Sequence, residues 1–246
     1  IETYWNQLYS DSVLTIYIDG LKNPNNYRNY DLREFKTIWI INYSLLFVSI
    51  LSFLNFKKIK SQRLGLVNLG FIALTVAVFL IQGLYALSEL RVSYLEQTDS
   101  QYYQRSVFNI GIRYVSFVFF SLTLISCFKY IRQDFIQRGF KKTYDFMLHI
   151  SVLWIASSEL INWMDIAEST QSYKLGLSIL WGAYSLFVIA LGIWKKKKYL
   201  RIGAIILFGV TLIKLFFYDI SHLDTIAKTI VFISLGGLLL IISFLY

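Results

Sequence analysis

The chain carries seven apolar runs of about 20 residues, and these runs restrict its fold more than any other feature. A helix of about 20 apolar residues crosses the hydrocarbon core of a bilayer, which is roughly 30 Å thick. The runs are continuously apolar, whereas the strands of a transmembrane barrel alternate, so a barrel is excluded. The sequence therefore predicts an all-α transmembrane bundle with about seven spans. They lie near 37–56, 64–87, 107–128, 146–164, 175–194, 202–218 and 226–246.

The composition agrees with a membrane protein and excludes several soluble classes. Hydrophobic residues make up 56% of the chain and charged residues 16%, and the mean hydropathy is +0.53. Cys127 is the one cysteine, so no intrachain disulfide can form, and two scattered histidines make no zinc site. Nucleotide-binding and metalloprotease motifs are absent from the sequence. We therefore expect no metal and no cofactor.

Charge is distributed unevenly between the connecting loops. The loops 57–63, 129–145 and 195–201 hold 14 of the 24 lysine and arginine residues. The loops 88–105 and 165–173 hold two basic and five acidic residues. Because basic loops stay in the cytoplasm, we expect the N-terminus outside and the C-terminus inside. This topology also accounts for the net charge of +9, so no nucleic-acid partner is expected.

Two regions follow from this pattern. Residues 1–36 form an extracytoplasmic segment that is rich in aromatic residues, and residues 37–246 form the transmembrane domain. Similar stretches at 43–65 and 184–203 indicate that the spans are arranged as helical hairpins. The sequence starts at Ile1 and is still apolar at Tyr246. We expect it to be the C-terminal portion of a longer chain.

Ionisable residues inside or beside the spans gather on the predicted outer side. They are Glu89, Arg91, Arg113, Glu159, Lys214, Asp219, His222, Asp224 and Lys228. A charge at a helix centre costs about 2.5–3.5 kcal/mol on insertion scales, so such residues face the bundle interior and pair. Arg113 with Glu159 and Lys214 with Asp219 are the expected pairs, and together the nine residues predict a polar cleft that opens outward.

A structural interpretation of the same residues stays open. Lys214 could lay its aliphatic stem along lipid while its ammonium group reaches the headgroups. Asp224 and Lys228 are four residues apart on one helix face and could bond to each other. Glu159 could serve only a polar contact between helices. In that case the charges hold the bundle together and bind no substrate.

The last 70 residues carry a family resemblance. The stretches "SILWGAYSL", "LRIGAIILFGVTLIKLFFYD" and "SHLDTIAKTIVFISLGGLLL", with "FKTIWIINYSLL" and "SSELINWMD" upstream, resemble the C-terminal part of the domain of unknown function 2339 family. That family comprises bacterial multi-pass membrane proteins with long chains. The resemblance implies a bacterial inner-membrane location, and it transfers no catalytic residue.

Three functions fit these observations. The first is binding or transport of a polar, anionic or lipid-linked substrate in the outward cleft, in contact with membrane lipids. The second is a non-catalytic scaffold or complex subunit with protein partners. The third is an envelope lipid or glycan transferase, in which Glu159, Asp219 or Asp224 acts as base and Arg113, Lys214 or His222 holds an anionic donor. Substrate handling ranks first.

Overall fold

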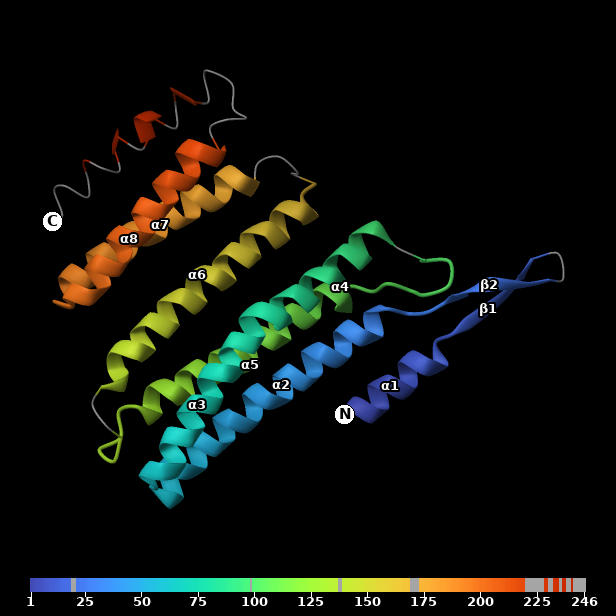
Figure 1. The fold of residues 1–246 in the computed structure, drawn as a ribbon, viewed down its shortest axis with the longest axis horizontal. Coiled ribbons are helices and arrows are strands. Elements are labelled where there is room, and N and C mark those ends of the chain that lie inside the picture. The colour runs from blue at the N-terminus through green and yellow to red at the C-terminus, as the bar shows by residue number, and fades with distance from the viewer. Residues whose placement is uncertain are drawn as a thin grey trace. The chain divides into compact units, whose positions relative to one another are not determined.

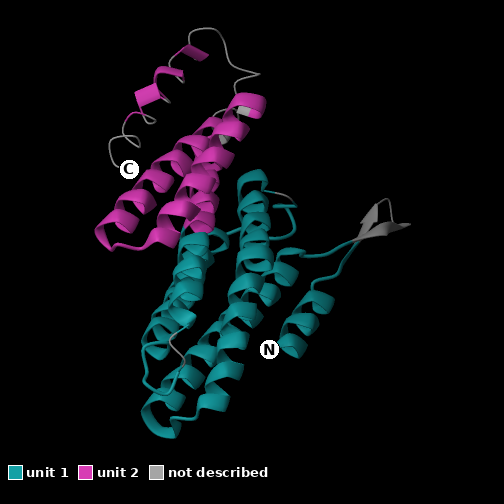
Figure 2. Cartoon of the chain, turned by 60° about the vertical axis from the view of Figure 1, so that its left-hand side comes forward, with its two compact units in different colours: residues 1–152 teal, residues 153–246 magenta. Residues whose placement is uncertain are grey.

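The computed structural model describes residues 1–18, 21–97, 99–136, 139–168 and 173–219, with short stretches at 228–229, 232–234, 236–237 and 240. These residues form eight α-helices, three π-helical turns and one two-stranded hairpin (Figure 1). The chain divides into two compact units, Ile1–Val152 and Leu153–Tyr246, which Figure 2 colours separately. The boundary predicted after residue 36 separates a polar segment from membrane helices, and it stays a prediction.

Unit 1 begins with a small α/β segment that the sequence did not predict. Helix α1 (Glu2–Asp11) leads into strands β1 (Leu14–Ile18) and β2 (Leu21–Tyr27), which pair antiparallel with Leu14 opposite Tyr27. Both strands are edges, so a strand carrying the chain's one proline is tolerated there. The described part of the chain is therefore all-α apart from this hairpin.

Long helices make up the rest of unit 1. They are α2 (Asp31–Leu54) with the π-turn η1 (Asn55–Ile59), α3 (Gln62–Val78), the π-turn η2 (Phe79–Gly83), α4 (Leu84–Glu96), α5 (Phe108–Tyr130) and the first part of α6 (Phe140–Ile166). Helix α2 begins six residues before the predicted span, because residues 31–36 form a polar first turn and a half. The predicted second span ends at residue 87, whereas α4 continues to Glu96.

Three polar pairs join α2 and the π-turn η1 that continues it to α5. They are Asn42 with Ser116 (3.1 Å), Ser49 with Thr123 (3.0 Å) and Asn55 with Tyr130. The partners in each pair are 74 or 75 residues apart, so the two helices run parallel and in register. On α5 the polar residues recur every seven positions, which is the spacing of left-handed coiled-coil packing. Hydrogen bonds between helices are an ordinary means of association where lipid surrounds the bundle.

Close packing surrounds these polar pairs. The rings of Phe79 and Phe120 stack with centroids 4.6 Å apart. Gly65 lies against Tyr130, and a Cβ atom there would stand 2.6 Å from the tyrosine hydroxyl. A side chain at position 65 would therefore displace Tyr130 from Asn55. The glycine is needed for contact between α3 and α5.

Unit 2 contains the end of α6 and a helical hairpin. Helix α7 (Tyr173–Trp194) turns at residues 195–197 into α8 (Lys198–Lys214), which ends in the π-turn η3 (Leu215–Asp219). A Cβ atom on Gly192 would lie 3.1 Å from the backbone nitrogen of Arg201, so this tight turn requires glycine. Val188, Ile189, Leu200 and Ala204 form the core between the two helices.

Five helical segments in the described part are long and apolar enough to cross a membrane: Asp31–Ile59, Gln62–Glu96, Phe108–Tyr130, Leu175–Trp194 and Lys198–Tyr218. This agrees with a multi-pass membrane protein. The predicted fourth span, 146–164, lies within α6, which has 27 residues but is not among the five. The predicted seventh span, 226–246, falls largely outside the described residues. Large apolar side chains such as Phe47, Leu74 and Val118 point outward, as lipid-facing residues do.

Candidate anion-binding end of the bundle

A buried ion pair marks the end of unit 1 where α2 begins. Asp31 opens α2 and is 7% exposed. Its Oδ2 atom lies 2.9 Å from Nη1 of Arg105, and Nδ2 of Asn109 donates to the same oxygen at 2.7 Å. Arg105 also donates to Oδ1 of Asn29 at 2.8 Å. We name this group of four residues the Asp31 cluster, and the end that contains it the Asp31 end.

The N-terminal segment is hydrogen-bonded to the Asp31 end. The Tyr103 hydroxyl donates to the carbonyl oxygen of Ser12 at 2.6 Å, and the backbone N–H of Asn29 donates to Oγ of Ser12 at 3.2 Å. Burial raises the pKa of Tyr103. The ring of Tyr27 lies 4.9 Å from that of Tyr102, measured between centroids. The loop before α5 therefore packs against the segment that precedes α2, although the two are far apart in sequence.

Aromatic stacking holds α1 against the first turns of α2. The ring of Phe35 stacks on Trp5 at 6.0 Å and on Phe108 at 5.7 Å. The Lys36 ammonium group donates to Oδ1 of Asn6 at 3.0 Å. Trp5 thus joins the end of the bundle through Phe35. Aromatic rings at this level are typical of the interface between membrane and water.

Two further arginines are buried at the Asp31 end. Arg91 is 5% exposed on α4, and Arg113 is 1% exposed on α5, five residues beyond the helix start at Phe108. At 1.5 Å per residue, Arg113 lies roughly 8 Å along the helix. Its guanidinium carbon stands 5.5 Å from the centroid of the Phe117 ring. Asn109 and Arg113 are four residues apart, so the cluster and Arg113 share one face of α5.

Acidic side chains accompany these arginines. Glu89 is exposed on α4, and its carboxylate accepts a hydrogen bond from the Tyr85 hydroxyl. Glu34, on the first turn of α2, is close enough for the charge of Glu89 to act on it. The negative charges lie nearer the surface than the guanidinium groups. Among the described residues of unit 1, Arg113 is the charged residue with the smallest exposed fraction, at 1%.

The burial of charge is one-sided. Among the described residues, Asp31, Arg91 and Arg113 are the buried charged residues, and all three lie at the Asp31 end. At the opposite end of unit 1 the cations are exposed, as at Lys57, Lys129 and Arg132. A buried guanidinium is a fixed fork of donors that suits phosphate and carboxylate oxygens. The Asp31 end is therefore the part of unit 1 whose chemistry suits an anion.

Unit 2 contains the other predicted site residues that the structure describes. The Lys214 ammonium group donates to Oγ of Ser178 at 2.8 Å, and Nε1 of Trp181 donates to Oγ of Ser157 at 2.9 Å. Ser178 and Trp181 are three residues apart on α7, so one helix contacts both α8 and α6. Glu159, two residues after Ser157, is half-buried. Serine hydroxyl groups therefore accept the hydrogen bonds that Lys214 and Trp181 donate between these helices.

The predicted pairs are not tested. Arg113 belongs to unit 1 and Glu159 to unit 2, so this pair stays a prediction. For the second pair, the structure gives Lys214 a hydroxyl partner, while the side chain of Asp219 lies outside the described part. His222 and Asp224 also lie outside the described residues. Lys228 is half-buried within a described stretch of two helical residues.

The site contains residues that sequence reasoning did not select. Asp31, Arg105 and Asn109 lie outside the predicted apolar runs or at their very edge, where charge is ordinary. Arg105 follows Asp31 by 74 residues, the separation that also relates Asn42 to Ser116, but this regularity is recognised only from the structure. No group of three metal-binding side chains occurs among the described residues.

One protein-family model matches most of the chain. The model of the DUF2339 family, described as a predicted membrane protein, matches residues 19–246. The chain belongs to the DUF2339 family. No curated protein and no solved structure matches this DUF2339 chain. The match covers all of unit 2, most of unit 1 and every predicted site residue, and it confirms the resemblance seen in the sequence.

Proposed function

We propose that this DUF2339 protein binds an anionic lipid or lipid-linked substrate at the Asp31 end of the bundle and moves or presents it in the outer half of the membrane. The observation that carries the proposal is the burial of Arg91 and Arg113 at one end of unit 1. By the positive-inside rule the opposite end, with its basic loops, faces the cytoplasm. The proposed location is the bacterial inner membrane, with the N-terminus outside.

Burial of charge supports this proposal because it is costly. Ionisable residues at membrane depth face the bundle interior or a polar cavity, and they mark substrate or ion pathways. Arg113 is almost fully buried roughly 8 Å along its helix. Guanidinium groups at such a depth suit a phosphate-bearing headgroup, which can enter sideways from the lipid. The substrate class that follows is an anionic amphiphile.

Unit 2 carries a second set of ionisable residues that we include in the proposal. Glu159 lies on α6 and Lys214 at the end of α8, and Asp219, His222, Asp224 and Lys228 follow in the sequence. In this proposal Arg91 and Arg113 of unit 1 contact the anionic group and the carboxylate of Glu89 lies near them. Lys214 and Glu159 have the corresponding roles in unit 2. Carboxylates that hold guanidinium groups also weaken anion binding, which suits a protein that must release its substrate.

Native mass spectrometry of the full-length protein in mild detergent tests the proposal. The wild type is compared with Arg113→Ala and Glu159→Gln. The proposal predicts a defined lipid or glycolipid on the wild type that the folded variants lack, and its mass names the substrate class. A wild type that is well folded and carries no defined ligand contradicts the proposal.

A structural scaffold is the second candidate. The three polar pairs that recur every seven residues along α5 favour it. Those pairs and the Asp31 cluster lock parallel helices in register. A scaffold predicts that charge-neutralising variants lose thermal stability. It also predicts that native mass spectrometry detects no defined ligand on the wild type. Substrate binding predicts that a conservative variant such as Arg113→Lys keeps the fold and weakens ligand binding.

A further inference from the structure

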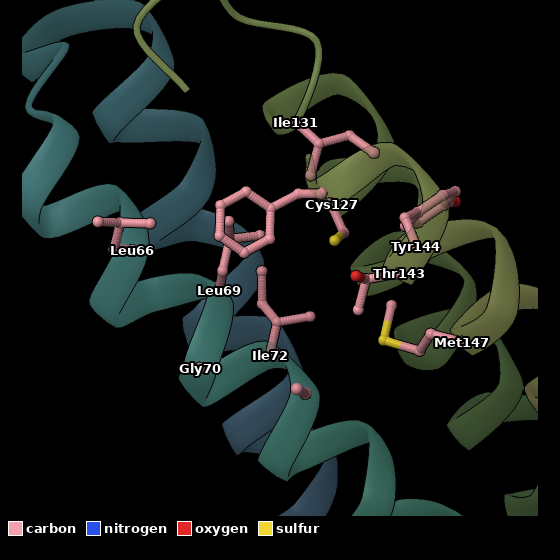
Figure 3. A pocket seen from close by; sticks show the side chains of 11 residues that line it. Leu66, Leu69, Gly70, Ile72, Cys127, Ile131, Thr143, Tyr144 and Met147 are labelled. Carbon is pink, nitrogen blue, oxygen red and sulfur yellow. The ribbon is translucent and has the colours of Figure 1, made fainter. Parts of the chain in front are cut away.

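An apolar groove lies at the end of unit 1 opposite the Asp31 end. It has a volume of about 300 Å³ and is lined from three helices, α3, α5 and α6, all by residues of unit 1. Figure 3 shows Leu66, Leu69 and Ile72 of α3 across the groove from Cys127 of α5 and Thr143 and Met147 of α6. Polar atoms in this lining are few. The groove is at the small end of ligand sites, which suits one narrow apolar chain.

Packing fixes the walls of the groove within unit 1. The Tyr144 hydroxyl donates to the carbonyl oxygen of Leu124 at 3.1 Å, and the rings of Tyr144 and Phe128 lie 5.7 Å apart. These contacts place the start of α6 against the end of α5. Gly70 supplies part of the opposite wall, and a Cβ atom there would meet nothing within 4 Å. The space beside Gly70 is therefore open.

Cations surround the groove on each of its three helices. Arg63 lies one turn before Leu66 on α3, Lys129 and Arg132 flank Ile131 at the end of α5, and Lys141 and Lys142 follow Phe140 on α6. All five are exposed, and the carboxylates nearby are Asp134 and Asp145. An apolar groove with a cationic rim matches an acyl chain beneath an anionic headgroup.

We propose that this groove holds one acyl chain of an anionic phospholipid from the leaflet that the basic loops face. The charge of the rim selects the headgroup, and the apolar walls hold the chain alongside Ile72 and Met147. This site is separate from the proposed substrate site, because the two lie at opposite ends of unit 1. The lipid fills a gap between α3 and α6 that protein side chains leave open.

Photocrosslinking in vesicles tests the proposal. The full chain is reconstituted in phosphatidylcholine with a trace of phosphatidylglycerol that carries a diazirine in its acyl chain, and adducts are mapped by mass spectrometry after digestion. The proposal predicts that adducts concentrate on residues 66–73 and 140–147. Adducts spread evenly over all lipid-facing helices would overturn it.

Two variants fill the groove without touching its rim. Gly70→Leu and Ala73→Leu should each lower the adducts several-fold, and having two variants covers the case in which one fails to fold. Gly111→Leu is the matched control, because a Cβ atom at Gly111 also meets nothing within 4 Å and the site lies at the Asp31 end of α5. Unchanged adduct yields in a folded groove variant would contradict the proposal.

The headgroup is tested separately. A phosphatidylcholine probe with the same diazirine chain should label the groove several-fold less than the phosphatidylglycerol probe. The double variant Arg132→Gln with Lys141→Gln should remove this preference while labelling by the phosphatidylcholine probe stays the same. Equal labelling of the wild type by both probes would overturn the role of the cationic rim.

Discussion

Arg105 and Asp31 form a buried ion pair at 2.9 Å although 74 residues separate them in the chain. The same separation relates Asn42 to Ser116 and Ser49 to Thr123. The ion pair is therefore the first member of a series that continues along α2 and α5. Asn42–Ser116 and Ser49–Thr123 follow from the parallel packing of α2 and α5 in register, whereas Arg105 lies in the loop before α5 and reaches the start of α2 from there.

The ion pair should be essential for stability. Asp31→Asn leaves the guanidinium of Arg105 buried without its carboxylate, and loss of one partner of a buried pair costs about 3–5 kcal/mol. Thermal unfolding in detergent should show a large drop, and adding Arg105→Gln should restore part of it. Asp134→Asn, at an exposed position, is the control and should have little effect. Equal melting temperatures for Asp31→Asn and this control would contradict the prediction.

The Asn42–Ser116 hydrogen bond should contribute modestly to the free energy of unfolding. Double-mutant cycles in membrane proteins give about 0.6 kcal/mol for such bonds, and at most about 1.7. We expect a coupling of this size between Asn42→Ala and Ser116→Ala. Ser44 bonds within its own helix, so Ser44→Ala with Ser116→Ala should be additive. Strict additivity of the first pair would show that the bond does not contribute.

Alkaline pH should loosen the N-terminal segment. Burial raises the pKa of Tyr103, so the folded state favours the neutral hydroxyl that donates to Ser12. This contribution is complete below the ordinary tyrosine pKa of about 10 and is lost as the pH rises through the higher folded pKa. Tyr103→Phe should cost about 1 kcal/mol and remove that part of the pH dependence. Melting temperatures from pH 8 to 11 measure both effects, and identical profiles for wild type and variant would exclude this role.

The pair of Arg113 and Glu159 that the sequence predicts can be tested by charge reversal. Removal of either charge should be strongly destabilising, by about 3–5 kcal/mol if the pair is buried. The charge-reversed double variant Arg113→Glu with Glu159→Arg should recover stability that each single reversal loses. Unfolding measured in the same detergent gives the coupling energy. A coupling near zero would show that the two residues do not contact.

Five of the seven predicted spans coincide with helices that are long and apolar enough to cross a membrane, because apolar runs in lipid leave few alternatives to a helix. Their ends were less predictable, since Asp31 and Glu96 lie in polar sequence that continues the helix in the structure. The π-turns at Asn55–Ile59 and Phe79–Gly83 had no signal in hydropathy. A turn of this kind depends on how neighbouring helices pack.

The polar contacts were predictable only in part. Arg113 was selected because a charge within an apolar run is costly, and it proved almost fully buried. Asp31 and Arg105 were missed because charge in a connecting segment is ordinary. Hydropathy does not show that the loop before α5 folds back onto the start of α2. The regular separation along the chain is visible only once both helices are known to be parallel.

Ligand binding at the Asp31 end can be measured by comparing variants at the two ends of unit 1. Native mass spectrometry of the full-length protein would compare wild type, Arg113→Lys and Arg113→Ala with Lys57→Ala, which removes an exposed cation at the opposite end. We expect a bound anionic amphiphile, distinct in mass or stoichiometry from the groove phospholipid, that is kept in Lys57→Ala, weakened in Arg113→Lys and lost in Arg113→Ala while the proteins stay folded. Equal occupancy in all four proteins would contradict it.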